Sequence, residues 1–361
     1  MLVIEFEQLS ALGLTPALAN RAAVLAATVG QVAEMLRITA VHRSTVGAHD
    51  GRAERSARPL PRLMRTLQEE GHALAVGDWV LATCDAFGET WVEARISPSS
   101  HIARRGSDGR IHPIVSNVDT ALLVMGLDDD FNPRRLERYL ALVHGDGVAP
   151  VVVLTKADIA TPTEASLQQR LGLLQGRVPP NVEVCAVNAM EPSAARTLAP
   201  YCMRGRTLVL LGSSGAGKST LTNTLLGAPV QDTGAVRSND GRGKHTTTSR
   251  SLHRLPGGAC VIDTPGLRTL RPDADEASLA PAYDDIAALA ARCRFRDCRH
   301  AEEPGCAVRE GIGADRLRNY HKLLREVRRD TLTALDKQRQ VAMWKGRGRA
   351  AKVRIKAKRG E

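Results

Sequence analysis

The chain has 361 residues, of which 43% are hydrophobic and 25% are charged, and its formal net charge is +11. This length is sufficient for two or three domains with cores of their own. The apolar runs are shorter than the ~20 residues that cross a bilayer, and Glu5 and Glu7 stand where a signal peptide carries basic residues. Composition therefore argues against a membrane-spanning or exported protein. We expect a soluble cytoplasmic protein with a polyanionic partner and no membrane partner.

In the first third of the chain, the sequence pattern predicts a helical extension over 1–36 and a small β-barrel over 37–112. Short segments of alternating polarity favour strands in the second range, and VGDWVLATCDAFGETWVEARI contains two strands joined by a glycine turn. Trp79 and Trp91 lie in these two strands. They could stack on nucleic-acid bases, but tryptophans in half-buried strands also serve as core residues.

Segment 113–275 alternates apolar strands with helices, and its strand VVVLTKAD (151–158) ends in a motif that can read guanine. The Asp158 carboxylate can accept hydrogen bonds from the N1–H and 2-amino groups of guanine, whereas adenine would leave it unpaired. Lys156 can lay its methylene groups along the base. The alternative is an ordinary strand-to-helix turn with a capping aspartate. A later strand, VEVCAVNA, could offer the Ala189 N–H to the guanine O6.

The stretch TLVLLGSSGAGKST (207–220) has the form G-x-x-x-x-G-K-[ST] of a phosphate-binding loop. Its members are Gly212, Gly217, Lys218 and Ser219. The glycines let backbone N–H groups surround phosphate oxygens at a helix N-terminus, the lysine reaches the β- and γ-phosphates, and the serine hydroxyl can bind Mg²⁺. A chance Gly/Ser turn is the alternative. The apolar strand before the loop and the helix-like KSTLTNTLLG after it favour the nucleotide site.

Two further stretches fit the parts of a GTPase that sense the γ-phosphate. The strand-to-loop segment ACVIDTPG supplies Asp263, suited to hold Mg²⁺ through water, and Gly266, whose N–H can bond the γ-phosphate. The polar, Gly-rich segment DGRGKHTTTSR (240–250) is typical of a mobile switch that offers a threonine hydroxyl to Mg²⁺. Thr247 is favoured for this role, with Thr246 as its rival.

The base motif precedes the phosphate-binding loop in this chain. GTPases ordinarily have the phosphate loop first, then the switches, then the base motif. We therefore predict a circularly permuted P-loop GTPase domain of the α/β class. The rotation is tolerable because an open α/β sheet builds its site from loops at the carboxyl ends of several strands, and their arrangement does not depend on where the chain begins.

The segment CRFRDCRHAEEPGC holds three cysteines and one histidine within fourteen residues, a spacing that suits one tetrahedral structural Zn²⁺. The predicted ligands are Cys293, Cys298, His300 and Cys306. A disulfide is the alternative, but the total of seven cysteines is odd and the others are scattered. We therefore predict a zinc-binding and helical domain over 276–344.

The final stretch, KGRGRAAKVRIKAKRGE (345–361), contains eight Lys or Arg residues and one Glu. Its apolar content is very low, so we expect a disordered basic arm that binds a polyanion, RNA in preference to DNA. A solvated terminus that only aids solubility is the alternative.

The rotated motifs, the series GSSGAGKST, KHTTT and DTPG, the barrel in front and CRFRDCRHAEEPGC behind together resemble the ribosome small-subunit-dependent GTPase A family. The resemblance covers the chain from about residue 37 onward. It implies an OB-fold barrel and a GTP phosphohydrolase that acts late in maturation of the small (30S) ribosomal subunit and hydrolyses GTP when bound to it. The implied partners are GTP or GDP and the subunit with its 16S rRNA. We expect a monomer.

The resemblance also assigns site residues. It implies that Thr155, Lys156 and Asp158 bind guanine. Two positions depart from the family pattern, because Thr155 replaces the commoner Asn and Asn188-Ala189 replaces Ser-Ala. The residues implied to bind phosphates and Mg²⁺ are Gly212, Ser213, Ser214, Gly215, Ala216, Gly217, Lys218, Ser219 and Thr220.

Many GTPases place a glutamine after the DTPG motif to orient the attacking water, but this chain has Leu267 there. We therefore expect slow turnover by the enzyme alone. The missing role could fall to His245, which is otherwise a solvated loop histidine, or to a group that the ribosome supplies.

Two other classes of function compete with a ribosome-dependent GTPase. One is a zinc-dependent RNA-binding module that keeps nucleotide only for structure, and the Gly-rich switch with its threonines argues against it. The other is a translation-factor-like or membrane-associated GTPase, for which neither a lipidation motif nor an amphipathic membrane helix is evident.

Overall fold

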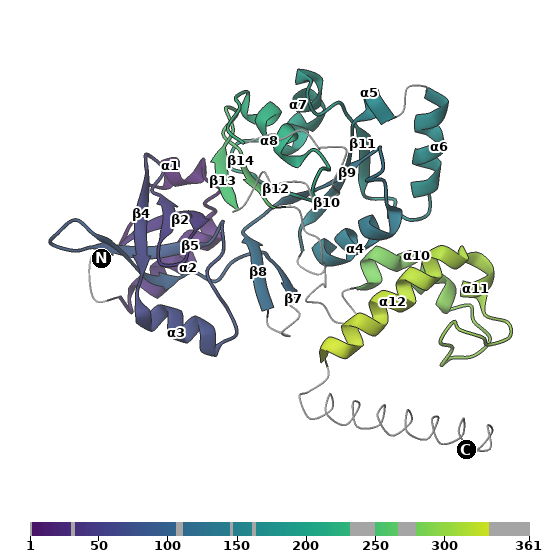
Figure 1. The fold of residues 1–361 in the computed structure, drawn as a ribbon. Coiled ribbons are helices and arrows are strands. Elements are labelled where there is room, and N and C mark those ends of the chain that lie inside the picture. The colour runs from purple at the N-terminus through teal and green to yellow at the C-terminus, as the bar shows by residue number, and fades with distance from the viewer. Residues whose placement is uncertain are drawn as a thin grey trace, which may run out of the picture.

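The computed structural model describes residues 2–29, 33–105, 111–144, 147–160, 164–231, 250–265 and 279–331. An N-terminal barrel, a central sheet flanked by helices and a C-terminal group of helices follow one another along the chain (Figure 1). None of the helices in these ranges combines the length and the apolar composition of a membrane-spanning segment.

Five strands form a closed barrel near the N-terminus. They pair in the order β2-β3-β4-β6-β5, and β5 pairs back with β2. Only the β4–β6 pair is parallel, and helix α3 connects β4 with β5. This topology is that of an OB-fold, so the expected barrel is confirmed. The elements are β2 (Ala33–Val41), β3 (Val46–His49), β4 (Glu54–Pro59), α3 (Pro61–Glu69), β5 (Trp79–Cys84) and β6 (Thr90–Arg95).

The two barrel tryptophans have different surroundings. Trp79 is completely buried, and the guanidinium carbon of Arg37 lies 5.4 Å from the centre of its ring. This tryptophan is therefore a core residue that cannot stack on a base. Trp91 is half-buried and donates its Nε1–H to the Asp85 carboxylate over 3.0 Å.

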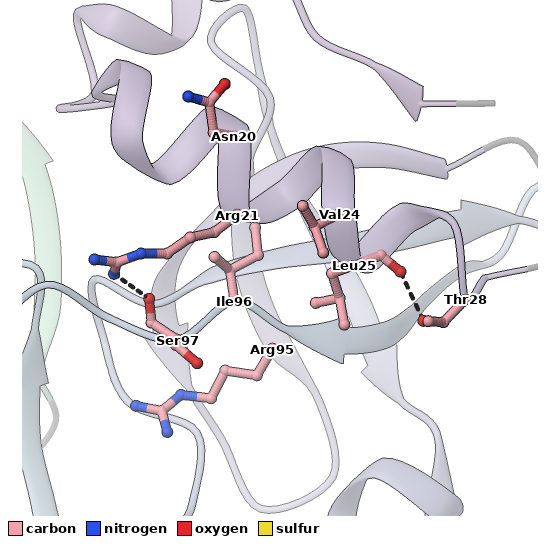
Figure 2. A pocket seen from close by; sticks show the side chains of 8 residues that line it. All are labelled: Asn20, Arg21, Val24, Leu25, Thr28, Arg95, Ile96 and Ser97. Atoms are coloured by element: carbon pink, nitrogen blue, oxygen red, sulfur yellow. Dashed lines mark hydrogen bonds between the residues drawn. The ribbon is translucent and has the colours of Figure 1, made fainter.

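The residues before the barrel form β1 (Leu2–Val3), α1 (Phe6–Ser10) and α2 (Pro16–Ala26). Strand β1 pairs with β2, which begins at Ala33, inside the range that the sequence assigns to the extension. Helix α2 lies against the barrel, where the Arg21 guanidinium donates to the Ser97 carbonyl over 2.9 Å. A groove of about 480 Å³ runs between α2 and the end of β6, with Val24 and Ile96 among its lining residues (Figure 2). The extension is thus attached to the barrel by packing and hydrogen bonds.

The central sheet has the strand order β11-β10-β9-β12-β14-β13. The first five strands are parallel, and β13 runs antiparallel to β14 at the end. The strands are β9 (Thr120–Gly126), β10 (Ala149–Thr155), β11 (Glu183–Ala186), β12 (Thr207–Gly212), β13 (Ser251–Arg254) and β14 (Cys260–Asp263). The helices are α4 (Pro133–His144), α5 (Ala157–Ala160), α6 (Glu164–Leu174), α7 (Pro192–Leu198), the 3-10 turn η1 (Ala199–Tyr201) and α8 (Lys218–Leu226).

The sheet is covered on both faces, and for this reason its inner strands β9, β10 and β12 are mostly apolar on both sides. Successive residues of β9 alternate between two cores. Leu123 packs in the core that contains Leu140 of α4, whereas Leu122 packs in the core that contains Leu221 of α8. Sequence patterns of this kind are typical of parallel strands with helices on either side.

Barrel and sheet are continuous, because β13 also pairs with β2. Arg37 of β2 reinforces this junction and is completely buried. Its guanidinium donates to Thr207 Oγ1 of β12 over 2.8 Å, to the Asn117 carbonyl over 2.9 Å and to the Leu12 carbonyl. Burial lowers the pKa of Arg37. One buried side chain therefore links the N-terminal segment, the barrel and the strand that leads into the phosphate loop.

A hairpin and a group of helices complete the described chain. Strands β7 (His101–Arg105) and β8 (Ile111–Ser116) form a separate two-stranded sheet between the barrel and the central sheet (Figure 1). The C-terminal elements are the 3-10 turn η2 (Ala280–Tyr283), α10 (Asp284–Ala290), α11 (Ala307–Gly311) and α12 (Ala314–Thr331). Both η2 and α12 contact α4.

Candidate functional site

The predicted nucleotide motifs meet at the carboxyl ends of the parallel strands. Strand order reverses between β9 and β12, since β10 and β11 lie on one side of this point and β14 on the other. Open α/β sheets bind ligands at such a switch point. The loops after β9, β10, β12 and β14 contact one another there.

The phosphate loop joins β12 to α8 and needs glycine at several positions. Gly215 and Gly217 have φ of 84° and 89°, in the left-handed region that favours glycine. A Cβ on Gly212 would clash with the Val124 carbonyl oxygen of the neighbouring strand β9. The loop therefore follows a compact path that backbone sterics impose.

Lys218 begins helix α8 and turns its ammonium group back into the loop. Its Nζ donates to the Ser213 carbonyl over 2.7 Å, and the side chain is 6% exposed. Burial lowers the pKa of Lys218 to about 8, although the carboxylates of Asp263 and Asp130 act in the opposite direction. A bound phosphate would supply the counter-charge that this buried ammonium group needs.

The two described candidates for Mg²⁺ binding lie side by side. Ser219 Oγ is 3.4 Å from Asp263 Oδ2, and Asp263 is completely buried at the end of β14. The next residue, Thr264, donates its hydroxyl to the Leu210 carbonyl of β12 over 2.6 Å and fixes the start of the DTPG loop. Hydroxyl and carboxylate oxygens are the ligands that Mg²⁺ prefers, so this pair fits the ion.

The base motif contacts the phosphate loop directly. Thr155 ends β10, is completely buried and donates its hydroxyl to the Ala216 carbonyl over 2.6 Å. Lys156 follows with φ of 60°, a rare conformation for a residue other than glycine. Asp158 is exposed in the first turn of α5, where a base could reach its carboxylate.

Sequence reasoning missed the acidic loop after β9. Asp128 accepts a hydrogen bond from Lys156 Nζ over 2.6 Å, and this bond lowers the pKa of the Asp128 carboxyl even though burial acts to raise it. Asp130 accepts from Ser213 Oγ of the phosphate loop over 2.5 Å and pairs with Arg135. The signal available in the sequence is the DDD run at the end of an apolar parallel strand, the same position that defines the other motifs.

The remaining predicted residues are less informative. Ala189 is buried in the loop after β11, and its carbonyl accepts from Thr224 Oγ1 of α8 over 2.6 Å. Several of the predicted functional positions lie outside the described residues, namely His245, Thr246, Thr247, Gly266, Leu267 and the basic stretch 345–361.

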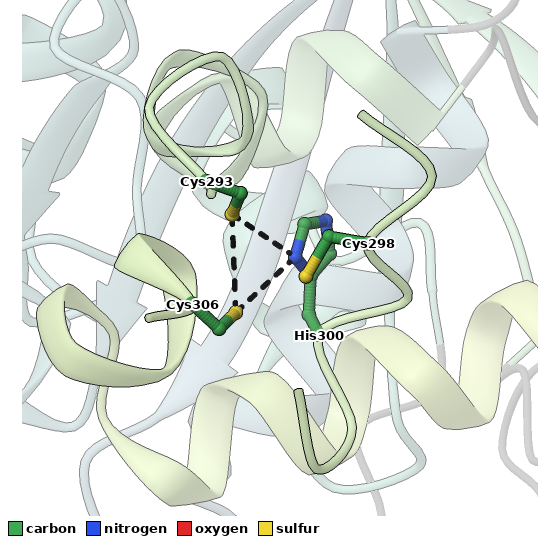
Figure 3. A group of neighbouring side chains, drawn as sticks. All are labelled: Cys293, Cys298, His300 and Cys306. Carbon is green, nitrogen blue, oxygen red and sulfur yellow. Dashed lines mark hydrogen bonds between the residues drawn. The ribbon is translucent and has the colours of Figure 1, made fainter. Parts of the chain in front are cut away.

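The predicted metal ligands form one cluster near the C-terminus (Figure 3). The ligand atoms of Cys293, Cys298, His300 and Cys306 all lie within 4.8 Å of one another. The Sγ atoms of Cys293 and Cys306 are 3.9 Å apart, and they lie 3.6 and 3.5 Å from His300 Nδ1. Tetrahedral zinc with Zn–S bonds of about 2.3 Å separates its sulfurs by about 3.8 Å. The cluster therefore has the size and the donor set of a metal site.

Neighbouring groups support this cluster. Backbone N–H groups at the start of α11, that of Val308 foremost, lower the pKa of the Cys293 thiol and so favour the thiolate that metal binding needs. The His300 carbonyl lies 3.1 Å from His321 Nε2 of α12. Thus the cluster is fixed to both α11 and α12.

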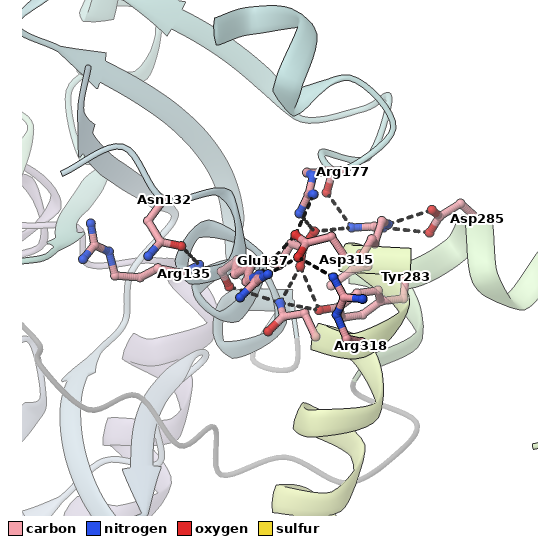
Figure 4. A network of polar contacts seen from close by, with 12 residues as sticks. Asn132, Arg135, Glu137, Arg177, Tyr283, Asp285, Asp315 and Arg318 are labelled. Carbon is pink, nitrogen blue, oxygen red and sulfur yellow. Dashed lines mark hydrogen bonds and ion pairs between the residues drawn. The ribbon is translucent and has the colours of Figure 1, made fainter. Parts of the chain in front are cut away.

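A buried ionic network joins the C-terminal helices to α4 (Figure 4). Its centre is Glu137 of α4, whose side chain is 1% exposed and which pairs with Arg316 of α12 over 3.1 Å and with Arg177 over 3.0 Å. Arg316 also pairs with Asp285 of α10 over 2.7 Å, and Asn319 donates to Glu137. Because buried charges are costly unless they are paired, this network specifies how the C-terminal helices dock on the central sheet.

The central sheet has a phosphate loop after β12, and the other nucleotide motifs surround this loop in rotated chain order. This arrangement defines the class of protein, which is a circularly permuted P-loop GTPase. A family model described as RsgA GTPase matches residues 96–272. The "Small ribosomal subunit biogenesis GTPase RsgA" of Xanthomonas campestris pv. campestris (strain B100) is 48% identical over 300 residues, which are 81% of this chain and 80% of that protein. The chain belongs to the RsgA family.

Further relatives agree with this assignment. The protein of the same name from Xanthomonas euvesicatoria pv. vesicatoria (strain 85-10) is 47% identical, with 81% of this chain and 80% of that protein covered. The crystal structure of YjeQ from Thermotoga maritima has a TM-score of 0.57 and 22% identity, covering 81% of this chain and 98% of that chain. A structure described as YloQ, a circularly permuted GTPase, has a TM-score of 0.57 and 20% identity, covering 83% of this chain and 97% of that chain. At these identities the two structures support the fold.

Proposed function

We propose that the chain hydrolyses GTP to GDP and phosphate during late maturation of the small ribosomal subunit, with its turnover stimulated by that subunit. The observation that carries the proposal is the hydrogen bond between Thr155 and Ala216, which unites the base motif with the phosphate loop in one site. The small subunit enters as the partner from the names of the relatives. Contact with its 16S rRNA, a monomeric state and a cytoplasmic location are parts of the same proposal.

Nucleotide binding follows from the chemistry of the site. Asp158 accepts two hydrogen bonds from guanine, and the Lys156 stem lies along the base while Asp128 holds its ammonium group. The phosphates occupy the loop from Gly212 to Thr220, where Lys218 exchanges the Ser213 carbonyl for phosphate oxygens. Ala189 stays a candidate for the guanine O6.

Hydrolysis needs Mg²⁺ and a positioned water. Ser219 and Asp263 are the proposed ligands, together with Thr247, and the ion when bound neutralises charge on the phosphate oxygens. The Gly266 N–H bonds the γ-phosphate. His245 holds the attacking water as a neutral imidazole when the subunit is bound. Without this step, turnover is slow, since Leu267 cannot orient a water.

The regions outside the nucleotide site have structural and binding roles in this proposal. One structural Zn²⁺ is held by the cluster of three cysteines and His300. The basic tail 345–361 strengthens subunit binding through phosphate contacts. The proposed units include a GTPase domain to residue 275, a zinc-binding helical domain to 344 and the tail. The sequence places the end of the extension at 36 and the end of the barrel at 112, but β2 already begins at Ala33 and the β7–β8 hairpin extends past 112.

The proposal is tested by GTP turnover of the full chain with and without isolated small subunits. We expect slow turnover alone and a large stimulation. His245→Ala should keep GTP and subunit binding but lose most of the stimulation. His72→Ala, a change at an exposed barrel histidine, is the control and should keep both binding and stimulation. Turnover that is unchanged by subunits would contradict the proposed function. Full stimulation in His245→Ala would move the water-positioning role to the RNA or to another residue.

A further inference from the structure

A small pocket lies where the barrel, the β7–β8 hairpin and the nucleotide site adjoin. Its volume is about 220 Å³. The barrel contributes Val41 and the segment 74–76, the hairpin contributes Pro113 and Ile114, and the GTPase region contributes Arg250 and Pro265. Arg250 directly precedes β13, and Pro265 follows the Asp263-Thr264 pair at the end of β14. The pocket therefore borders both chain segments that lead into the γ-phosphate sensors.

Two arginines carry positive charge at this pocket or beside it. Arg250 lines it, and Arg104 of β7 stands beside the Ala103–Pro113 pair in the hairpin register, opposite His112. Within the described part of the chain, the Nε atoms of both arginines are buried and have no hydrogen-bond partner. Among the described residues, neither arginine takes part in an ion pair. Burial and then the charge of Arg104 lower the pKa of Arg250, so the two guanidinium groups repel each other.

Such an arrangement is unfavourable unless an anion joins it. Placing two like charges together in a partly buried site has an electrostatic cost that one shared anion removes. Guanidinium groups present a planar fork of N–H donors that matches phosphate oxygens, and charge-assisted bonds of this kind are among the strong ones. By comparison, the buried Arg316 is accompanied by the carboxylates of Glu137 and Asp285.

We propose that Arg104 and Arg250 form a binding site for one phosphate group, and that an RNA backbone phosphate is its occupant. This inference rests on the proposed function, because the subunit supplies the RNA. The barrel and the net charge of +11 both favour RNA over a free anion as the source. A phosphate held there contacts the chain on both sides of the nucleotide site, so RNA docking is sensed next to the residues that respond to GTP.

The first arm of the test measures the salt dependence of binding between the full chain, loaded with a non-hydrolysable GTP analogue, and isolated small subunits. Arg104→Met and Arg250→Met keep the apolar stems and remove the charges. Loss of one phosphate contact should reduce the slope of log affinity against log salt by about 1. The double variant should also lose about 1, because both arginines meet the same phosphate. Arg196→Met, an equal charge change at an exposed residue of α7, controls for overall charge.

The second arm uses inorganic phosphate as the probe. With Mg–GDP saturating and ionic strength constant, phosphate should raise the melting temperature of the parent more than that of either variant. If the variants lose this rise in melting temperature but bind subunits with the same salt slope as the parent, RNA is overturned as the source of the phosphate and free phosphate is favoured. Unchanged slope and unchanged shift in both variants would overturn the site itself. If the parent fails to bind subunits, the proposed function fails, and the phosphate arm still decides the site.

Discussion

The Thr155 hydroxyl donates to the Ala216 carbonyl over 2.6 Å, although the two residues are 61 positions apart in the chain. Thr155 ends the strand that carries the base motif, and Ala216 lies within the phosphate loop. Both residues are completely buried. Circular permutation has changed the order of these motifs along the chain, but this bond keeps them together in space.

Thr155→Val should weaken both folding and nucleotide binding. The substitution keeps the shape of the side chain but leaves the buried Ala216 carbonyl without its donor, at a cost of about 1–3 kcal/mol. Urea unfolding and GDP titration measure the two effects. Thr155→Ser keeps the hydroxyl and is the matched control. Parent-like stability and affinity in Thr155→Val would show that the bond does not support the site.

GDP affinity should decline as the pH rises above about 8, because the pKa of Lys218 is lowered to about 8 by burial and only the ammonium form attracts phosphate. The lowered pKa of Lys218 also determines how the stability of the protein changes with pH. Between this pKa and the ordinary lysine value, the unfolded chain binds more protons, so the free energy of unfolding of the nucleotide-free protein should rise with pH. Titrations between roughly pH 7 and 9 measure the decline. GMP lacks the β-phosphate, so its affinity should decline less over the same pH range. A GDP affinity that does not change with pH would contradict this role of Lys218.

Glu137→Gln should destabilise the protein strongly. It removes the one carboxylate that both Arg177 and Arg316 face in a buried network, and breaking a buried pair costs about 3–5 kcal/mol. Glu326→Gln is the control, because its bidentate pair with Arg138 also joins α12 to α4 but is partly exposed. The control should cost about 1 kcal/mol or less. Denaturant unfolding of the two variants provides the comparison, and equal losses would mean that burial does not set the strength of this network.

Purified protein should contain one zinc ion per chain. Removing it, or substituting Cys306→Ser, should destabilise the C-terminal helices by several kcal/mol, since small zinc-finger peptides gain ~10–16 kcal/mol from the metal. Elemental analysis and thermal unfolding with and without chelator are the measurements. Cys84→Ser changes an exposed cysteine outside the cluster and should have little effect. A folded, zinc-free C-terminal region would rule the site out.

The sequence predicted those features that local spacing encodes. The phosphate loop, the base motif and the metal cluster each depend on residues close together in the chain, so a pattern of a few residues identifies them, and the permutation follows from their order. Burial of Trp79 was one of two open interpretations, because alternating polarity does not say which face of a barrel strand packs against another element.

Features that depend on contacts between residues far apart in the chain could not be predicted from the sequence. Asp128 and Asp130 act on the base motif and the phosphate loop only because β9 lies between β10 and β12 in the sheet. Glu137 and Arg316 are 179 positions apart. A charged residue on a helix is ordinarily solvated, and only the docking of α12 on α4 turns this pair into a buried contact.

The central claim is that the motif Thr155-Lys156-x-Asp158 recognises the guanine base of a nucleotide whose phosphates bind in the phosphate loop further along the chain. Its most direct test is the binding of GDP, XDP and ADP to the parent and to Asp158→Asn. The parent should prefer GDP, and the variant should lose at least about tenfold in GDP affinity while gaining affinity for XDP, because the Asn amide can donate to the xanthine O2. Asp129→Asn, a change at an exposed neighbouring aspartate, should behave as the parent does. If Asp158→Asn keeps the parent's preference for GDP over XDP, the motif does not read the base, and the account of this site is wrong.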